Sequence, residues 1–223
     1  MRLKLAVNAL VKFFCGLILV GLLLFLPAGS FSFLNGWLLI VLLFIPMIFL
    51  GIFLLWKEPQ LLAKRLDSKE SESSQKLVVL LSGFVFIAGF TVAGLDFRFG
   101  WTQMPTALVW FGSALLLVSY ALYAEVMREN AYLSRTVTVQ EGQKVIDTGL
   151  YGSVRHPMYS ATLCLFLSFA LVLGSFWALL CFLIFIPIFV LRIFGEEKLL
   201  SKELYGYEEY QKKVRFRLIP FVW

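Results

Sequence analysis

The chain has 223 residues, of which 60% are hydrophobic, and it carries a net charge of +6. Several apolar runs approach the roughly 20 residues that a membrane-spanning helix needs, so the composition excludes a soluble globular domain and indicates an all-α, polytopic membrane protein. The positive charge is typical of the cytoplasmic loops of such proteins and gives no support to nucleic-acid binding. The single histidine and the three cysteines, all in apolar runs, predict neither a metal site nor a disulfide framework.

The first half of the chain predicts four membrane-spanning helices. The first begins near residue 13, or nearer residue 5 if the Lys12 side chain snorkels toward the surface. Pro46 lies inside the second helix and is expected to kink it. Residues 57–76 are polar and charged, which predicts a surface helix followed by a flexible linker. The four expected helices span residues 13–26, 35–56, 77–95 and 106–127.

The longest polar segment of the chain follows, at residues 128–156. Within it, residues 134–139 alternate between polar and β-branched side chains, which is the pattern of a strand. A turn signal at residues 141–143 comes directly afterwards. We therefore expect two short extended pieces around this turn.

A helical hairpin and a charged helix are predicted after the polar segment. Residues 157–173 form one apolar run, a Gly-Ser pair breaks it, and residues 176–194 return through the membrane. Pro187 interrupts the returning helix and frees backbone groups that other residues must satisfy. Residues 195–214 then form a charged helix outside the membrane. The chain thus has about six membrane segments.

The basic residues are distributed very unevenly along the chain. Of the 20 lysines and arginines, 19 lie in the N-terminal lead-in, the two polar segments and the chain from Arg192 onward, and Arg98 is the exception. With six segments these basic regions fall on one side, which the positive-inside rule makes the cytoplasm, together with both termini. The lack of a targeting signal favours a bacterial cytoplasmic membrane, with the endoplasmic reticulum as the alternative. We divide the chain into N-terminal transmembrane helices (1–127) and a cofactor-binding and catalytic region (128–223).

The first motif is residues 149–159, a glycine-containing basic loop that runs into an apolar helix. Pro157 suits the first helical position, and His156 lies near the N-cap. The first turn of that helix offers N–H groups and a positive dipole end, which favour carboxylates or phosphates. Taken alone, the loop is explained by a helix cap after a surface turn, but a second cluster favours a functional site.

This second cluster lies where the last apolar segment leaves the membrane. Arg192 and Glu196 are four residues apart and share a helical face, whereas Glu197 points elsewhere. An arginine at this depth is costly unless it is paired or used, so the alternatives are an interfacial salt bridge and a functional site. A third stretch, residues 204–220, carries aromatic and charged residues and by itself predicts a membrane-surface anchor.

Together the three stretches resemble the isoprenylcysteine carboxyl methyltransferase family and its phospholipid methyltransferase relatives. The family pattern is a Gly-x-Tyr-x-x-x-Arg-His-Pro-x-Tyr run, a helical hairpin, an Arg-x-x-x-Glu-Glu exit, and a Tyr-x-x-Tyr helix ending in a basic stretch and Ile-Pro. Here these elements are residues 149–159, 192–197 and 207–220, in the same order and with compatible spacing. Leu150 stands where many members have proline, and the surroundings of Arg215 differ from the Arg-Val-Pro form of many members.

The resemblance implies an integral membrane methyltransferase that uses S-adenosylmethionine and acts on a lipid-like or prenylated acceptor. The cofactor would lie between the Arg-His-Pro loop and the C-terminal helix. The resemblance makes Arg192 and Glu196 the catalytic residues: Arg192 would hold a carboxylate acceptor, or Glu196 would take the proton of a phospholipid amine. The implied cofactor-binding residues are Tyr151, Arg155, His156, Pro157, Tyr159, Glu197 and Tyr210.

Two other classes of function stay open at this point. A membrane NADPH-dependent oxidoreductase resembling steroid or sterol reductases would bind a nicotinamide cofactor instead. A membrane scaffold would use the same clusters only as surface anchors. The expected partners are membrane lipid and a lipophilic or prenylated substrate. The sequence assigns no oligomeric state, no choice among O-, N- and S-methylation, and no roles to Arg215 and Arg217.

Overall fold

The computed structural model describes residues 2–66, 73–133 and 138–223. Within these ranges the chain is helical and contains no strand, which confirms the predicted all-α class. The helices, in chain order, are α1 (Arg2–Ala28), α2 (Leu34–Lys57), α3 (Pro59–Leu66), α4 (Ser73–Phe99), α5 (Thr106–Glu129), the short 3-10 helix η1 (Gly149–Gly152), α6 (Pro157–Leu173), α7 (Phe176–Leu183), α8 (Phe185–Glu203) and α9 (Tyr207–Lys213).

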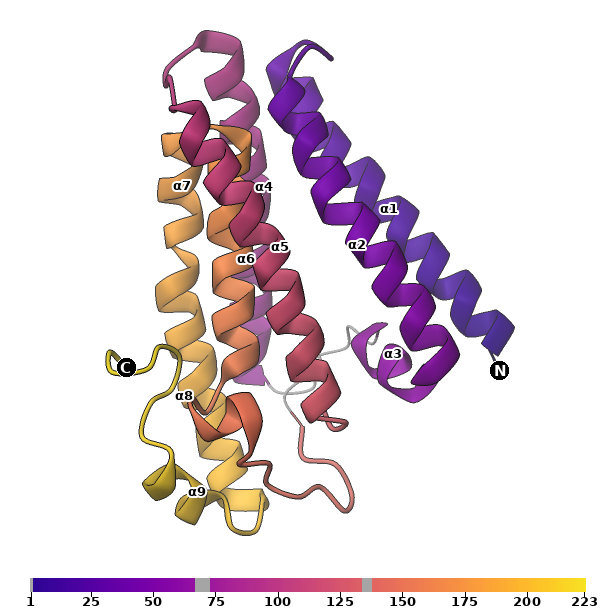
Figure 1. The fold of residues 1–223 in the computed structure, drawn as a ribbon, viewed down its shortest axis with the longest axis vertical. Helices are drawn as coiled ribbons and strands as arrows, with labels where there is room; N and C mark the ends of the chain where they lie inside the picture. Colours follow the sequence, from indigo (N-terminus) through magenta and orange to yellow (C-terminus); the bar gives the residue numbers. More distant parts are fainter. Residues whose placement is uncertain (1, 67–72, 134–137) are drawn as a thin grey trace.

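Five helical segments are long and apolar enough to cross a membrane. They are α1, α2, most of α4, α5, and α7 with α8, which follow each other as Phe176–Glu203. The sixth expected segment, α6, has 17 residues and is shorter than the roughly 20 of a spanning helix. The long helices run up and down along one axis, with α1 and α2 leaning away from the others at the end that carries α3 (Figure 1).

The helices extend beyond the boundaries expected from hydropathy. α1 begins at Arg2, and α4 continues to Phe99, so part of the expected loop 96–105 is helical. The physical reason is that a helix satisfies its own backbone groups, and polar residues at its ends do not have to break it. Asp96 then holds the chain beyond α4, because its carboxylate accepts a 2.8 Å hydrogen bond from the Thr102 backbone N–H.

The two prolines inside apolar segments behave differently. α2 runs without interruption through Pro46. In contrast, the helix that returns through the membrane is divided at Ile184, between α7 and α8. Pro187 has no N–H to donate to the carbonyl three to four residues earlier, which explains why the interruption lies there. The predicted interruption is confirmed.

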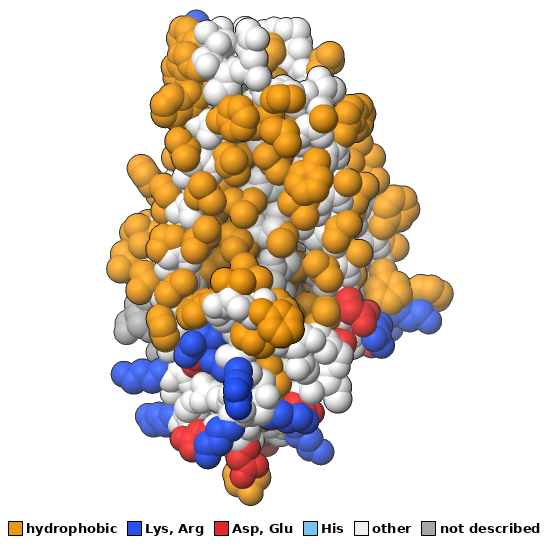
Figure 2. All heavy atoms as spheres, turned by 60° about the vertical axis from the view of Figure 1, so that its left-hand side comes forward, with side chains coloured by type: hydrophobic (Ala, Val, Ile, Leu, Met, Phe, Trp, Pro, Cys, Tyr) orange, Lys and Arg blue, Asp and Glu red, His pale blue; other side chains and the backbone are white. Residues whose placement is uncertain are grey.

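Charged side chains gather at one end of the helical bundle, as the face shown in Figure 2 illustrates. That end also carries α3, α9, the loops around them and the start of α1, while Arg98 on α4 lies toward the opposite end (Figure 1). For the basic residues within the described ranges, the predicted separation from Arg98 is matched by the fold; Lys69 and Arg135 lie outside these ranges. The cytoplasmic orientation and the choice of membrane stay predictions.

The core between α4, α6, α7 and α8 is built from phenylalanine rings. Phe166 and Phe185 have ring centroids 4.4 Å apart, and Phe86 lies 4.7 Å from Phe166. Close approach of the helices depends on small residues. A Cβ atom at Gly89 would lie 2.7 Å from the Phe182 ring.

The polar segment between α5 and α6 contains no strand in its described part, so the expected extended pieces do not form a β-ladder within residues 138–148. Residues 134–137 of the predicted strand lie outside the described ranges. The predicted turn is confirmed, because the Gln143 N–H donates to the Gln140 carbonyl and Gly142 has φ of +70°. Side chains hold the segment instead of a ladder: Lys64 donates to the Gln140 side chain, and the Tyr132 hydroxyl donates to the Gly142 carbonyl.

Candidate active site

The C-terminal tail lies directly against the loop that precedes α6. The N–H groups of Arg155 and His156 donate to the Phe216 and Arg217 carbonyls, both at 2.9 Å. The Ser160 hydroxyl also donates to a tail carbonyl, at 2.5 Å. The two N–H groups that immediately precede α6 are therefore taken by the tail, and in the first turn the N–H groups of Tyr159 and Ser160 donate to the His156 carbonyl. The expectation that this helix start receives the cofactor carboxylate is not favoured by this geometry.

A buried charge cluster joins the loop, α8 and the tail. Arg155 Nε donates to Glu197 Oε1 at 2.7 Å, and His156 Nε2 lies 3.3 Å from the same oxygen. Arg217 Nε donates to Glu197 Oε2 at 3.0 Å. Arg155, His156 and Glu197 are all less than one tenth exposed. The loop and the charged helix, distant in the sequence, thus fold into one unit.

Arg155 also anchors the end of α9. Its Nη1 atom donates to the carbonyls of Val214 and Arg215, at 2.9 and 3.0 Å. The guanidinium of Arg217 is held in turn by two rings, with its Cζ atom 5.3 Å from the Phe194 centroid and 5.2 Å from that of Trp223. The tail is therefore an integral part of the site, rather than the surface anchor that the stretch predicted when taken alone.

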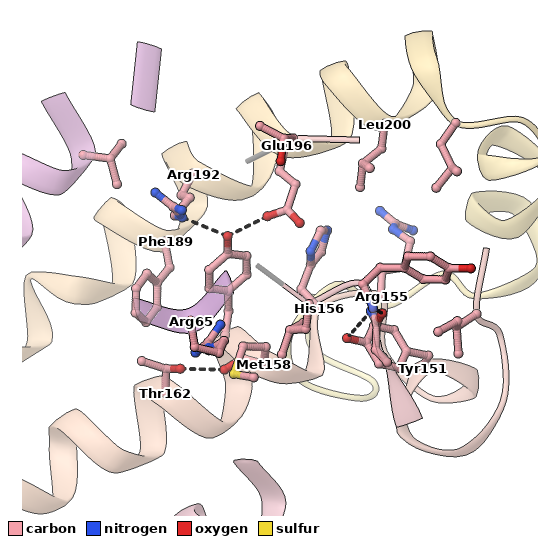
Figure 3. A pocket seen from close by; sticks show the side chains of 18 of the residues that line it. Arg65, Tyr151, Arg155, His156, Met158, Thr162, Phe189, Arg192, Glu196 and Leu200 are labelled. Carbon is pink, nitrogen blue, oxygen red and sulfur yellow. Dashed lines mark hydrogen bonds between the residues drawn. The ribbon is translucent and has the colours of Figure 1, made fainter. Parts of the chain in front are cut away.

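Tyr159 links the two residues predicted to be catalytic. Its hydroxyl donates to Glu196 Oε2 at 2.5 Å and accepts from Arg192 Nε at 2.9 Å (Figure 3). Arg192 and Glu196 project from α8, and Tyr159 comes from the first turn of α6. The shared helical face predicted for Arg192 and Glu196 thus meets a tyrosine from the neighbouring helix.

Two other tyrosines fix the position of η1 against α9. The Tyr210 hydroxyl donates to the Tyr151 carbonyl at 2.8 Å, and the Asn130 side chain donates to the Tyr151 hydroxyl at 2.9 Å. Burial raises the pKa of both the Tyr151 and Tyr210 phenols. Both side chains therefore stay neutral at physiological pH, with the Tyr210 hydroxyl as a hydrogen-bond donor and the Tyr151 hydroxyl as an acceptor.

A cavity of about 490 Å³ lies between these groups. Its volume falls in the range of roughly 300–1,000 Å³ that is typical of small-molecule sites. Pro157 and Glu197 do not line the cavity, so we assign Glu197 a positioning role through its contacts with Arg155, His156 and Arg217. Seven predicted site residues do line it: Tyr151, Arg155, His156, Tyr159, Arg192, Glu196 and Tyr210.

The cavity has a polar part and an apolar arm. The polar part lies among η1, the loop before α6, the end of α8 and α9. The apolar arm runs between α4, α6 and α8 and reaches the phenylalanine cluster at Phe86, Phe166 and Phe185. Gly83 and Val79 of α4 both line this arm and are exposed on the outside of the bundle. The arm therefore connects the polar part with the surface that would face lipid.

Several lining residues were not predicted from the sequence. Arg65, at the end of α3, lines the cavity with its guanidinium Cζ 5.2 Å from the Tyr123 ring centroid. Asn130, Leu200 and Tyr207 also line it. The polar and charged composition of residues 57–76 predicted only a surface helix followed by a flexible linker, and no motif pointed to Arg65. Because α3 and α4 contribute to the lining, the cavity draws on both sides of the predicted division at residue 127.

Residues 107–208 match the family model described as phospholipid methyltransferase. Over these residues, which are somewhat less than half of the chain, the sequence is similar to phospholipid methyltransferases. The match runs from α5 into α9 and includes every residue proposed for the site except Tyr210. The family resemblance read from the motifs is confirmed, and with it membrane methyl transfer as the general activity. The match gives no support to the reductase alternative.

Proposed function

We propose that the protein transfers a methyl group from S-adenosylmethionine to a lipophilic acceptor at the membrane surface. The observation that carries this proposal is the shape of the cavity. One end holds Arg192, Tyr159 and Glu196, and the other is an apolar arm that reaches the lipid-facing surface at Gly83. An amphiphile could place its head at the polar end while its tail stays in an apolar environment.

The residues of the polar part fit the chemistry of this cofactor. Aromatic faces and a carboxylate, supplied by Tyr159, Tyr210 and Glu196, favour a sulfonium ion. The donors His156 and Arg155 lie at the same end and favour its carboxylate. When bound, S-adenosylmethionine supplies an electrophilic methyl group.

Arg192 is the residue that we propose to hold the acceptor. Its guanidinium lines the cavity and is oriented by the Tyr159 hydroxyl. A carboxylate acceptor arrives ionised and needs only to be held in line, which a bidentate guanidinium does well. Alignment and exclusion of water, here by the surrounding phenylalanine rings, matter more for such a displacement than a strong base.

An amine acceptor would use the same residues differently. It must lose a proton, and Glu196 is the carboxylate that lines the cavity. Glu196 Oε2 accepts from the Tyr159 hydroxyl, and the second carboxylate oxygen, Oε1, would accept that proton. A carboxylate acceptor arrives ionised and needs no proton acceptor, so we propose carboxylate O-methylation as the preferred reaction, with phospholipid N-methylation second.

The test is transfer of a labelled methyl group from S-adenosylmethionine to a lipid extract by the purified protein. We expect label in an organic-soluble product that is released by mild base if the product is a methyl ester, and retained if it is an N-methyl amine. Absence of labelled product from extracts of several membrane types, with a correctly folded protein, would contradict the proposal.

A further inference from the structure

The hydroxyl of Tyr207 is a buried polar group that the site described above does not use. Tyr207 begins α9, directly after Gly206, which has φ of +84°. Its side chain is 4% exposed and lines the polar part of the cavity. Within the described part of the chain, its oxygen has no hydrogen-bond partner.

The other tyrosines that line the cavity differ from Tyr207 in this respect. Tyr210, one turn further along α9, donates to the Tyr151 carbonyl, and Tyr159 donates to Glu196. Tyr132 donates to the Gly142 carbonyl, and the Tyr151 hydroxyl accepts from Asn130. A buried hydroxyl without a partner is unfavourable, so such a group in a binding cavity points to a ligand that satisfies it.

The walls around Tyr207 indicate what kind of ligand this is. The Tyr207 and Tyr210 rings lie 5.7 Å apart, and Leu200, Leu204 and Val145 pack beside them. Flat aromatic and aliphatic walls suit a planar heteroaromatic ring, with a few polar groups to fix its orientation. The pKa of Tyr207 is raised, mainly by burial and further by the negative charges of Glu197 and Glu196. The phenol therefore keeps its proton. The neutral hydroxyl has a proton to donate, and a ligand atom that accepts a hydrogen bond would satisfy it.

We propose that the Tyr207 hydroxyl donates a hydrogen bond to the nucleoside part of the cofactor, whose base lies against the Tyr207 and Tyr210 rings. This inference rests on the proposed function, since it assumes that S-adenosylmethionine occupies the polar part of the cavity. A purine ring has nitrogen acceptors along its edge and a flat apolar face, which together match the hydroxyl and the walls. Tyr207 is then a binding residue in addition to the cofactor contacts that the family resemblance implied.

The test compares two phenylalanine variants of neighbouring tyrosines on α9. The Tyr207→Phe variant loses a single hydroxyl, which has no hydrogen-bond partner in the described part of the ligand-free protein. We expect its thermal midpoint without ligand to equal or exceed that of the wild type. Its affinity for S-adenosylhomocysteine, measured by calorimetry, should fall about 5- to 10-fold, which is typical for loss of one hydrogen bond.

Tyr210→Phe is the matched control. It removes a hydroxyl that is bonded to the Tyr151 carbonyl in the ligand-free protein, so the thermal midpoint should fall without ligand. Adenosine as a competitor should lose affinity for Tyr207→Phe in the same proportion as S-adenosylhomocysteine, because the proposed contact lies on the nucleoside.

The outcomes separate this inference from the proposed function. If wild-type protein binds neither S-adenosylmethionine nor S-adenosylhomocysteine, the proposed function fails and this inference fails with it. If the wild type binds and Tyr207→Phe binds equally well, the inference is overturned while the proposed function stands. A ligand-free midpoint that falls in Tyr207→Phe as far as in Tyr210→Phe would show a structural hydroxyl and would also overturn the inference.

Discussion

The guanidinium of Arg155 and the carboxylate of Glu197, 42 positions apart in the chain, form a buried ion pair with an Nε–Oε1 distance of 2.7 Å. The pair fixes the loop before α6 to α8, and Arg217 extends the same contact to the tail. Because Glu197 is surrounded by these cations, Glu196 is the neighbouring carboxylate that lines the cavity. Of two adjacent glutamates, Glu197 therefore joins the loop, α8 and the tail, and Glu196 lines the cavity.

Breaking this pair should destabilise the whole site. Glu197→Gln leaves Arg155 buried without its counter-charge, which typically costs about 3–5 kcal/mol. We expect a large drop in the thermal midpoint of the purified protein in detergent. The control is Glu125→Gln, which removes the exposed pair between Glu125 and Arg128 and should leave the thermal midpoint nearly unchanged. Equal effects of the two variants would show that Glu197 does not have the structural role assigned here.

Arg192→Lys should reduce turnover even though it keeps the positive charge. An ammonium cannot reproduce the planar fork that contacts Tyr159 and, as we propose, the acceptor. We expect kcat/KM to fall by about 10- to 100-fold, in line with the loss of a hydrogen bond to a charged group. Steady-state kinetics with labelled cofactor measure this, with affinity for S-adenosylhomocysteine as the control for folding. Near-normal turnover would remove Arg192 from the acceptor role.

Tyr159→Phe should affect the same step by a different route. The variant removes the hydroxyl that donates to Glu196 and accepts from Arg192 but keeps the aromatic ring. Both α8 side chains lose their shared partner, so we expect kcat to fall by about 10-fold or more while cofactor affinity changes less. A variant with unchanged kcat would show that this hydrogen-bond link is not needed for catalysis.

The apolar arm of the cavity predicts a size-sensitive portal at Gly83. A Cβ atom placed there meets no heavy atom within 4 Å, so Gly83→Leu fills open space without a clash and narrows the arm. Methyl transfer to a long-chain acceptor should fall several-fold, while cofactor affinity stays unchanged. Gly21→Leu is the matched control, because Gly21 on α1 is equally free of neighbours and does not line the cavity. If both variants lower activity to the same extent, the portal lies elsewhere.

The buried tyrosines predict loss of stability at high pH. A tyrosine in an unfolded chain ionises at about pH 10, and in the folded protein the pKa of Tyr151 and Tyr210 is raised by burial. Their contribution to stability is therefore fully present below about pH 10 and is lost as the pH rises above it. Thermal midpoints measured from neutral pH upward should fall above that value, and less steeply in the Tyr151→Phe, Tyr210→Phe double variant. An equal fall in the double variant would contradict this assignment.

Much of the fold follows from apolar runs alone. A segment inside a bilayer must satisfy its own backbone, so a long apolar run becomes a helix whatever its neighbours are. The helix ends were harder to predict, since α1 continues through Lys4 and Lys12, and α4 continues through Asp96. Near a membrane surface, polar side chains are compatible with either a helix or a loop. Hydropathy therefore does not predict the residue at which a membrane helix ends.

Part of the site was predicted, because many of its residues belong to short motifs that can be recognised by the spacing of residues close together in the sequence. The contact of α6 with α8 through Tyr159 follows from the hairpin between them, yet the shared partner of Arg192 and Glu196 is visible only in three dimensions. Arg65 and Tyr207 were missed because their place in the lining depends on how α3 and α9 fold back against the bundle. The periodicity of apolar residues along the sequence does not predict how α3 and α9 pack against the other helices.

The central claim is that the polar part of this cavity binds S-adenosylmethionine. Isothermal titration of purified wild-type protein with S-adenosylmethionine, with NADPH titrated in parallel, tests it most directly. We predict saturable, one-to-one binding of S-adenosylmethionine that S-adenosylhomocysteine competes away, and no heat of binding with NADPH. Absence of S-adenosylmethionine binding at millimolar concentration by folded protein, or saturable binding of NADPH instead, would contradict the claim.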